Sequence, residues 1–188
     1  MTNTESAKNT ESAQNTELVQ SISIDQLTGL LQSLGYRVTS SEQNGQTQLL
    51  SATQGIGFAL RFGNPAPQAG RYLDYTLSCA LRVQGDLPEN LVPQWNITKR
   101  FARLARQGDF LVLEMDVIVA GGVSDAYLRA NTELWDHLLQ QFLLFLRTVA
   151  AQPGASDAPA APAGVQDAAD AQVDAPQENH EDSAAQAA

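Results

Sequence analysis

The chain has 188 residues and a formal net charge of −10 at pH 7, and most of this charge lies outside its central part. Residues 22–152 are nearly neutral and long enough for one ordinary domain, whereas residues 1–21 and 153–188 hold almost no large apolar side chains. This distribution gives no electrostatic reason to expect nucleic-acid binding. Cys79 is the single cysteine, which excludes an intrachain disulfide and a cysteine-based zinc site.

The N-terminal residues repeat a polar hexad. Asn-Thr-Glu recurs every six residues, three times within residues 3–18. Polar hexads of this kind cannot bury an apolar face. We therefore predict that residues 1–21 form a disordered arm. The repeat is interpreted either as a recognition motif displayed in copies or as the product of repeat slippage, which is the simpler explanation.

The first predicted helix begins at Ser23. Ser23 and Gln26 stand at capping-box spacing, and Ile22 and Leu27 occupy the positions of a hydrophobic staple. Gly35 stands where a helix commonly ends with a left-handed residue. Leucines and an isoleucine recur between these ends at helical spacing, so one face of this helix must pack against the rest of the domain.

Four segments with strand character follow the first helix. They cover residues 36–42, 47–53, 56–62 and 72–83. Asn44-Gly45 is a strong signal for a tight hairpin between the first two, and Gln54-Gly55 marks the next turn. The fourth segment alternates apolar and polar residues, which is typical of a strand with one buried and one solvated face.

Residues 86–107 are predicted to be a second helix, with prolines near the start and Gly108 just past the end. This helix would carry three large apolar residues and a basic stripe that could hold an anionic partner or pair with nearby carboxylates. The apolar residues are Trp95, Phe101 and Leu104, and the basic residues are Lys99, Arg100, Arg103 and Arg106.

Residues 108–152 are the stretch around which the domain is organised. Residues 110–119 alternate with a period of two and are predicted to be a strand. Gly121-Gly122 ends it, Ser124 is a candidate N-cap, and apolar residues then recur at helical spacing up to Pro153. The fold predicted from these elements is α+β, with an antiparallel sheet of about five strands packed with three helices in the order α-β-β-β-β-α-β-α.

The C-terminal segment, residues 153–188, is rich in Ala, Pro, Asp, Gln and Glu and is predicted to be disordered. The most apolar run of the chain, residues 138–149, contains two glutamines and Arg147, so it is too polar and too short to span a bilayer. The N-terminus has no basic and apolar segments of a secretory signal. We therefore expect a cytoplasmic protein with no membrane partner.

Glu114 and Asp116 are the one carboxylate pair that could carry chemistry. They stand two apart on the predicted strand, hence on one face, about 6.5–7 Å apart. That spacing suits general acid and base work, but it also suits ion pairs with arginines such as Arg61 and Arg82 on other strands. His137 lacks further His or Cys partners for a metal, and Cys79 lies on an apolar strand face. We expect no catalytic residues, no metal and no cofactor.

Six residues are candidates for contact with a protein partner. Two features support them, namely a Trp-Asn pair within the second predicted helix and apolar residues nearly all round the last helix. They are Trp95, Asn96, Arg100, Phe101, Leu143 and Phe145. A helix that is apolar all round must be covered on both sides, so the last helix could form a homodimer, or the core could wrap around it.

Several short segments occur in an order that resembles a known family. They are Leu34-Gly35-Tyr36, Trp95-Asn96, Lys99-Arg100-Phe101-Ala102-Arg103, Leu113-Glu114-Met115-Asp116-Val117 and Gly121-Gly122-Val123-Ser124. Over residues 22–150 the chain resembles the YbjN family of small bacterial proteins, labelled "putative bacterial sensory transduction regulators". The resemblance implies a fold like that of type III secretion chaperones, a regulatory or adapter role in stress response, and no established enzymatic activity.

The sequence and the resemblance together predict a non-enzymatic protein-binding module. Docking of a partner segment on a sheet edge or beside the last helix would be its mechanism. One alternative is a small hydrolase or lyase that uses Glu114 and Asp116, which requires a cleft and a raised pKa on one carboxyl. Another is a scaffold that acts through its two disordered tails.

Overall fold

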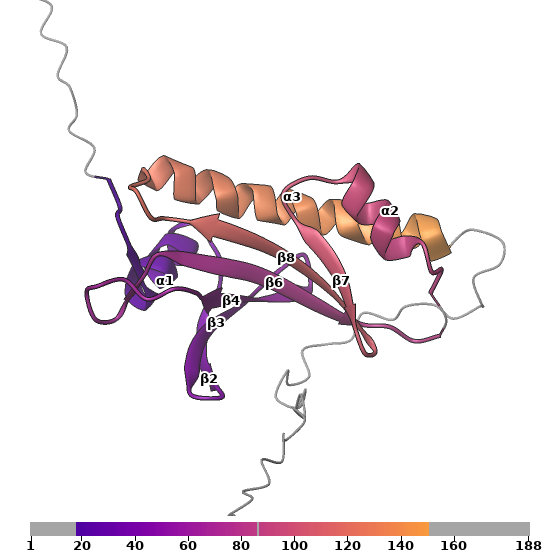
Figure 1. The fold of residues 1–188 in the computed structure, drawn as a ribbon, viewed down its shortest axis with the longest axis horizontal. Coiled ribbons are helices and arrows are strands. Elements are labelled where there is room, and N and C mark those ends of the chain that lie inside the picture. The colour runs from indigo at the N-terminus through magenta and orange to yellow at the C-terminus, as the bar shows by residue number, and fades with distance from the viewer. Residues whose placement is uncertain (1–17, 86, 151–188) are drawn as a thin grey trace, which may run out of the picture.

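The computed structural model describes residues 18–85 and 87–150, which form a sheet with a long helix lying across it (Figure 1). The elements, in chain order, are β1 (Ile22–Ser23), α1 (Ile24–Ser33), β2 (Thr39–Gln43), β3 (Gln46–Thr53), β4 (Ile56–Phe62), β5 (Arg71–Tyr72), β6 (Asp74–Arg82), α2 (Leu91–Thr98), β7 (Arg103–Gln107), β8 (Phe110–Ile118) and α3 (Asp125–Ala150). Six strands form one antiparallel sheet in the order β2-β3-β4-β6-β8-β7, and β1 and β5 form a small second sheet. The α+β class predicted from the sequence is confirmed.

The local signals of the N-terminal half are present as predicted. The Ser23 hydroxyl accepts from the Gln26 amide N–H, and the Gln26 side chain accepts from the Ser23 N–H, which completes the capping box. Gly35 takes a φ of 89° at the end of α1, where a residue with a Cβ would be strained. Asn44 and Gly45, with φ of 51° and 73°, form the two-residue turn between β2 and β3.

One hydrophobic core joins the sheet to the helices. The strand face that alternation predicted in β8 is buried, with its residues at most 2 % exposed, and α3 covers it. The largest fully buried side chains are Trp95, Trp135, Tyr75 and Phe142. Ser124 accepts from the Tyr127 N–H at 3.2 Å and caps α3, as predicted.

The predicted helix over residues 86–107 is wrong in its second half. Residues 91–98 form α2, but Lys99 is extended and residues 103–107 form strand β7, which pairs with β8. The sheet therefore has six strands rather than about five. Gly108, with a φ of 56°, lies in a two-residue turn between β7 and β8 instead of ending a helix. Without β7, the backbone N–H and C=O groups along that side of β8 would have no hydrogen-bond partners. The hydrogen bonds that β7 supplies outweigh the helix propensity of this Arg- and Ala-rich segment.

The domain begins earlier than residue 22. Val19 exchanges two backbone hydrogen bonds with Val123, of 2.8 and 3.0 Å, and Arg71 donates to the Ser21 hydroxyl at 2.7 Å. The segment before β1 is therefore held against the corner between β8 and α3. The predictions made for the hexad repeat and for residues 153–188 otherwise lie outside the described residues.

Candidate functional site

The end of α2 is fastened to the outer edge of the sheet by two side chains. The Trp95 indole N–H donates to the Ala102 carbonyl at 3.1 Å. The Asn96 side chain accepts from the Leu104 N–H at 2.8 Å and donates to the Leu104 carbonyl at 2.9 Å. A side-chain amide that accepts and donates in this way takes the place of a neighbouring strand. The β7 edge is thus closed at Leu104, where a free ladder group would otherwise invite strand addition.

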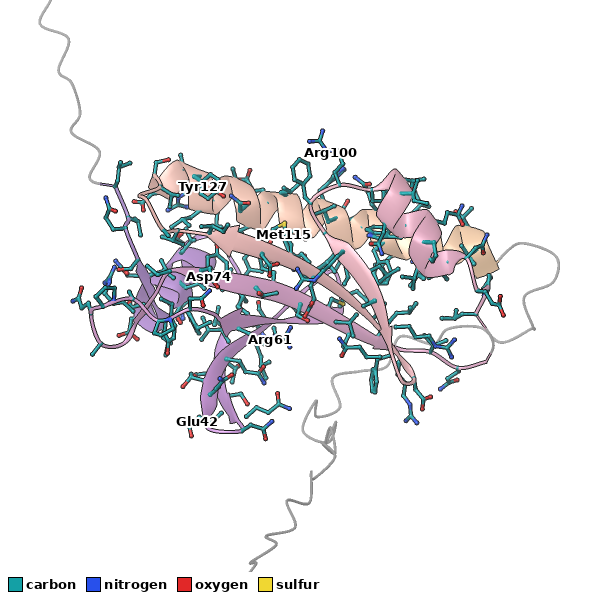
Figure 2. All side chains as sticks on the ribbon, in the orientation of Figure 1. Glu42, Arg61, Asp74, Arg100, Met115 and Tyr127 are labelled. Atoms are coloured by element: carbon teal, nitrogen blue, oxygen red, sulfur yellow. The ribbon has the colours of Figure 1, made fainter. Side chains whose placement is uncertain are left out.

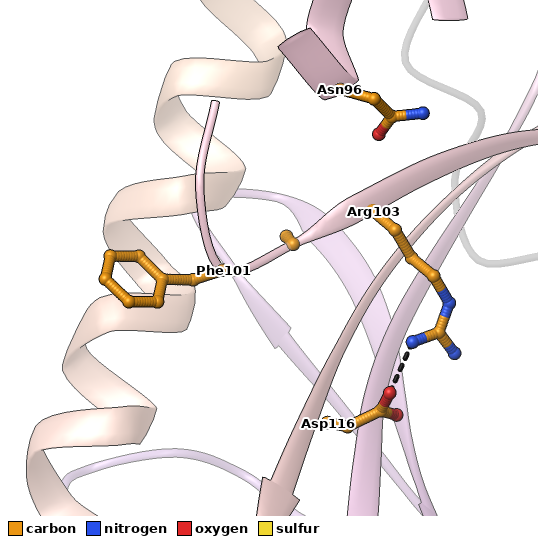
Figure 3. A pocket seen from close by; sticks show the side chains of 5 residues that line it. Asn96, Phe101, Arg103 and Asp116 are labelled. Carbon is orange, nitrogen blue, oxygen red and sulfur yellow. Dashed lines mark hydrogen bonds and ion pairs between the residues drawn. The ribbon is translucent and has the colours of Figure 1, made fainter. Parts of the chain in front are cut away.

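Phe101 lies in the connection between α2 and β7, directly before the anchored Ala102, in an unusual conformation. Its φ is 73°, in the left-handed region, which costs a residue with a Cβ about 1–2 kcal/mol. Its ring is 64 % exposed and lies 5.0 Å from the Arg100 guanidinium carbon. In Figure 3 the ring projects beside α3, away from Arg103 and Asp116. The fold therefore holds a large aromatic ring in water at the expense of backbone strain.

Two further large apolar side chains are exposed on the helices that flank Phe101. Ile97 on α2 is 83 % exposed and Leu144 on α3 is 64 % exposed. The end of α2 contacts this part of α3, since the Lys99 ammonium donates to the Gln141 side chain at 3.0 Å, one turn before Leu144. We call Ile97, Phe101 and Leu144 the α2 apolar surface. Large exposed apolar side chains on adjoining elements are candidates for contact with a partner.

The six residues predicted to contact a partner fall into two groups. Arg100 and Phe101 are exposed at the α2 apolar surface. Trp95 is fully buried, and its ring meets those of Phe142 and Phe145 at 5.3 and 5.4 Å, edge to face. Asn96 is engaged with the edge of β7, and Leu143 and Phe145 are half-buried.

Ile97 was not predicted from the sequence, and Leu144 lies between the two predicted residues Leu143 and Phe145 without having been named itself. A signal for Leu144 was present, because it stands about 200° around the helix from the buried Phe142. Ile97 stands at the same angle from Trp95 on α2. The positions opposite a buried stripe are the ones that reach solvent, and both residues are apolar where a polar residue is expected.

The carboxylate pair lies on the sheet face opposite α3, inside a network of ion pairs. Glu114 accepts from Arg61 and, at 2.9 Å, from Arg103, while Asp116 also accepts from Arg103. The cross-strand register explains the network, because Glu114 stands directly opposite Arg103 on β7. Thr76, opposite Asp116 on β6, donates to it at 2.6 Å. The predicted pairing with Arg61 is present, whereas Arg82 instead lies 3.8 Å from Asp109.

The electrostatics of this cluster favour the charged form of Asp116. Burial by itself raises the pKa of Asp116, but hydrogen bonds from Arg103 and Thr76 and the charges of Arg103 and Arg61 outweigh it and hold the pKa below its ordinary value. An open hollow of about 410 Å³ lies beside it, lined by Asn96, Phe101, Ala102, Arg103 and Asp116 (Figure 3). A carboxyl that stays ionised accepts hydrogen bonds and does not serve as an acid.

The remaining reactive side chains are separated from one another. His137 lies exposed on α3, and within residues 18–85 and 87–150 no three His, Cys, Asp or Glu side chains are grouped as metal ligands. Burial raises the pKa of the Cys79 thiol to about 12, so the thiolate needed for nucleophilic chemistry is scarce near neutral pH.

A family model described as "Putative bacterial sensory transduction regulator", YbjN, matches residues 23–147. The chain belongs to the YbjN family. The match takes in the whole sheet, α1, α2 and most of α3, so the α2 apolar surface lies within the family domain. Among curated proteins, none matches the chain. Across the described part of this YbjN protein, no helix combines the length and the apolar character needed to cross a membrane.

Proposed function

We propose that this YbjN domain is a non-enzymatic adapter that binds a partner protein through the α2 apolar surface. The observation that carries the proposal is Phe101, a ring that is 64 % exposed on a backbone with a φ of 73°. A residue keeps a strained backbone conformation only where surrounding contacts hold it there, and such residues cluster at functional sites. Here the anchors at Trp95 and Asn96 are the surroundings that hold it. An aromatic anchor fixed before binding loses little entropy when it enters a partner's pocket.

The geometry favours side-chain contact over strand addition at this end of the sheet. Asn96 already occupies the edge of β7 at Leu104, so an incoming strand would have to displace it. Recognition would instead use an apolar pocket on the partner that receives Phe101, with Ile97 and Leu144 around it. The same surface is available to a second copy of the chain, which is the homodimer suggested by the last helix.

The ion-pair network supports an adapter rather than an enzyme. Glu114 and Asp116 are held by arginines, and the lowered pKa of Asp116 suits a structural role better than proton transfer. The regulatory or stress-related role that family membership suggests would then depend on which protein the surface binds. A fold like that of secretion chaperones belongs to the same proposal.

Capture of a partner by four versions of the full chain tests this function. Wild type and Ile118→Ser should retain the same protein, whereas Phe101→Gly and Leu144→Ser should lose it. Ile118 is the matched control, because it is 62 % exposed but lies at the end of β8. Glycine relieves the strain at position 101, so Phe101→Gly should fold at least as stably as wild type while losing the partner.

Light scattering on the same four proteins distinguishes a partner from a second copy. A dimer that Leu144→Ser converts to a folded monomer would identify the partner as another copy of the chain. Equal capture and equal mass for all four proteins would mean that the α2 apolar surface binds nothing, and the proposal would be wrong.

A further inference from the structure

Four basic side chains, which follow α2 or lie on β7 and in the last turn of α3, have no carboxylate partner within the described residues. They are Lys99, Arg100, Arg106 and Arg147, which we call the basic end. The acids Glu114, Asp116 and Asp109 of the neighbouring strands and turn are paired with other arginines. The second half of α3, from residue 138 to residue 149, carries Arg147 and no acid. This end of the domain therefore presents uncompensated positive charge.

The contacts of these four side chains leave their charges available. The Lys99 ammonium contacts the neutral Gln141 side chain, and Arg100 lies over the Phe101 ring and projects from the outline of the molecule in Figure 2. Arg106 donates to the carbonyl of Gly108 at 3.4 Å. Among the described residues, Glu89 is the one other acid that adjoins α2. It precedes the helix, at the end toward which α3 runs after Phe145, and it offsets at most one of the four charges.

The acidic segment of the chain starts at this same place. Helix α3 ends at Ala150, and its last turns pack against α2 through Phe142 and Phe145. Residues 151–188 follow directly and contain no Lys or Arg. Their seven acids are Asp157, Asp167, Asp170, Asp174, Glu178, Glu181 and Asp182. At about 3.3–3.6 Å per extended residue, even Asp157 can reach beyond 20 Å from the helix end.

We propose that residues 151–188 dock on the basic end of their own chain and cover the α2 apolar surface. Tethering gives such a segment an effective concentration on the order of millimolar, so several weak charge contacts suffice. Val165 and Val173, the only large aliphatic residues between 153 and 188, would contact Phe101. The tail then competes with the partner protein for the α2 apolar surface. This competition rests on the proposed function, whereas docking of the tail does not.

A spin label in the tail tests docking without any partner. Ala171→Cys places a single reactive thiol between Asp170 and Asp174, because the Cys79 thiol is buried and has a pKa of about 12. Amide signals of residues 99–103 and 147–149 should lose about half their intensity or more, while those of the β2–β3 hairpin keep theirs. The broadening should disappear in 1 M salt, where the Debye length is about 3 Å.

Charge reversal shows whether the basic end is the docking site. The double variant Arg100→Glu, Arg147→Glu should abolish the broadening. Arg37→Glu is the matched control, since Arg37 follows α1 at the other end of the domain and also lacks a carboxylate partner among the described residues. Broadening that is uniform over the domain, or that survives the double variant, would overturn the proposal.

Two further measurements separate docking from the proposed function. Broadening that appears when spin-labelled protein is mixed with unlabelled, isotope-enriched protein would place the tail on another copy and would overturn docking within one chain. Partner capture should rise several-fold when the seven tail acids are changed to Asn and Gln. Tail contact without any partner would sink the proposed function alone, and partner binding without tail contact would sink the docking alone.

Discussion

Removal of the Asn96 side chain tests how α2 is attached to the sheet. Asn96→Ala eliminates two hydrogen bonds to Leu104, of 2.8 and 2.9 Å, each worth about 0.5–1.5 kcal/mol. Alanine is the better helix former by up to about 0.7 kcal/mol, which offsets part of the loss. We expect the free energy of unfolding to fall by about 0.3–3 kcal/mol. Asn96→Asp keeps the acceptor for the Leu104 N–H but cannot donate to the carbonyl, so its loss should be intermediate.

Denaturant unfolding and amide hydrogen exchange measure the two consequences. The midpoint should fall in Asn96→Ala, and exchange of the Leu104 amide should accelerate while that of Leu113, its partner position on β8, changes little. Gln94→Ala is the control, because Gln94 lies exposed on the same helix and its side chain has no hydrogen-bond partner among the described residues. An unchanged midpoint together with unchanged Leu104 exchange would refute the idea that Asn96 closes the sheet edge.

Three further outcomes are expected. The pKa of Asp116 is lowered in the folded protein. The charged carboxylate therefore stabilises the fold above the unfolded pKa of about 3.9, and this contribution is lost as the pH falls through the folded pKa. The difference in unfolding free energy between wild type and Asp116→Asn should shrink when the two are unfolded at successively lower pH. Cys79 should resist alkylation near neutral pH until the protein is unfolded, and stoichiometric labelling of the native protein would contradict its burial. Phe145→Asp should destabilise the fold strongly, because its ring packs on Trp95, whereas Leu144→Asp should leave the unfolding midpoint nearly unchanged; equal midpoints would mean that Phe145 is not part of the core.

Local chemistry was sufficient to predict most elements. The capping box of α1, the glycine at its end and the Asn44-Gly45 turn each depend on residues close together in the chain. Along β6 and β8, apolar and polar residues alternate because one face of the strand is buried, and burial in the structure matches this alternation. These signals hold because a hydrogen bond or a left-handed glycine acts within a few residues whatever the rest of the fold does.

The six predicted contact residues differ in exposure, and the misplacement of Trp95 has an identifiable source. Arg100 and Phe101, predicted as partner contacts, are exposed, whereas Trp95, predicted with them, is buried in the core. The error follows from extending α2 through residue 107, which put Trp95 and Phe101 on one helix. Gly108-Asp109, flanked by Gln107 and Phe110, was an available hairpin signal that argued against that helix.

The sequence alone determined the elements whose stabilising contacts are local, as well as the division into a neutral centre and acidic ends. Only the tertiary structure decided that residues 103–107 become an edge strand, because the gain comes from β8 and from two side chains of α2. The same contacts set the backbone of Phe101 at a positive φ and leave its ring exposed. Helix propensity ranks local states by fractions of a kcal/mol, and a complete set of strand and side-chain hydrogen bonds outweighs it.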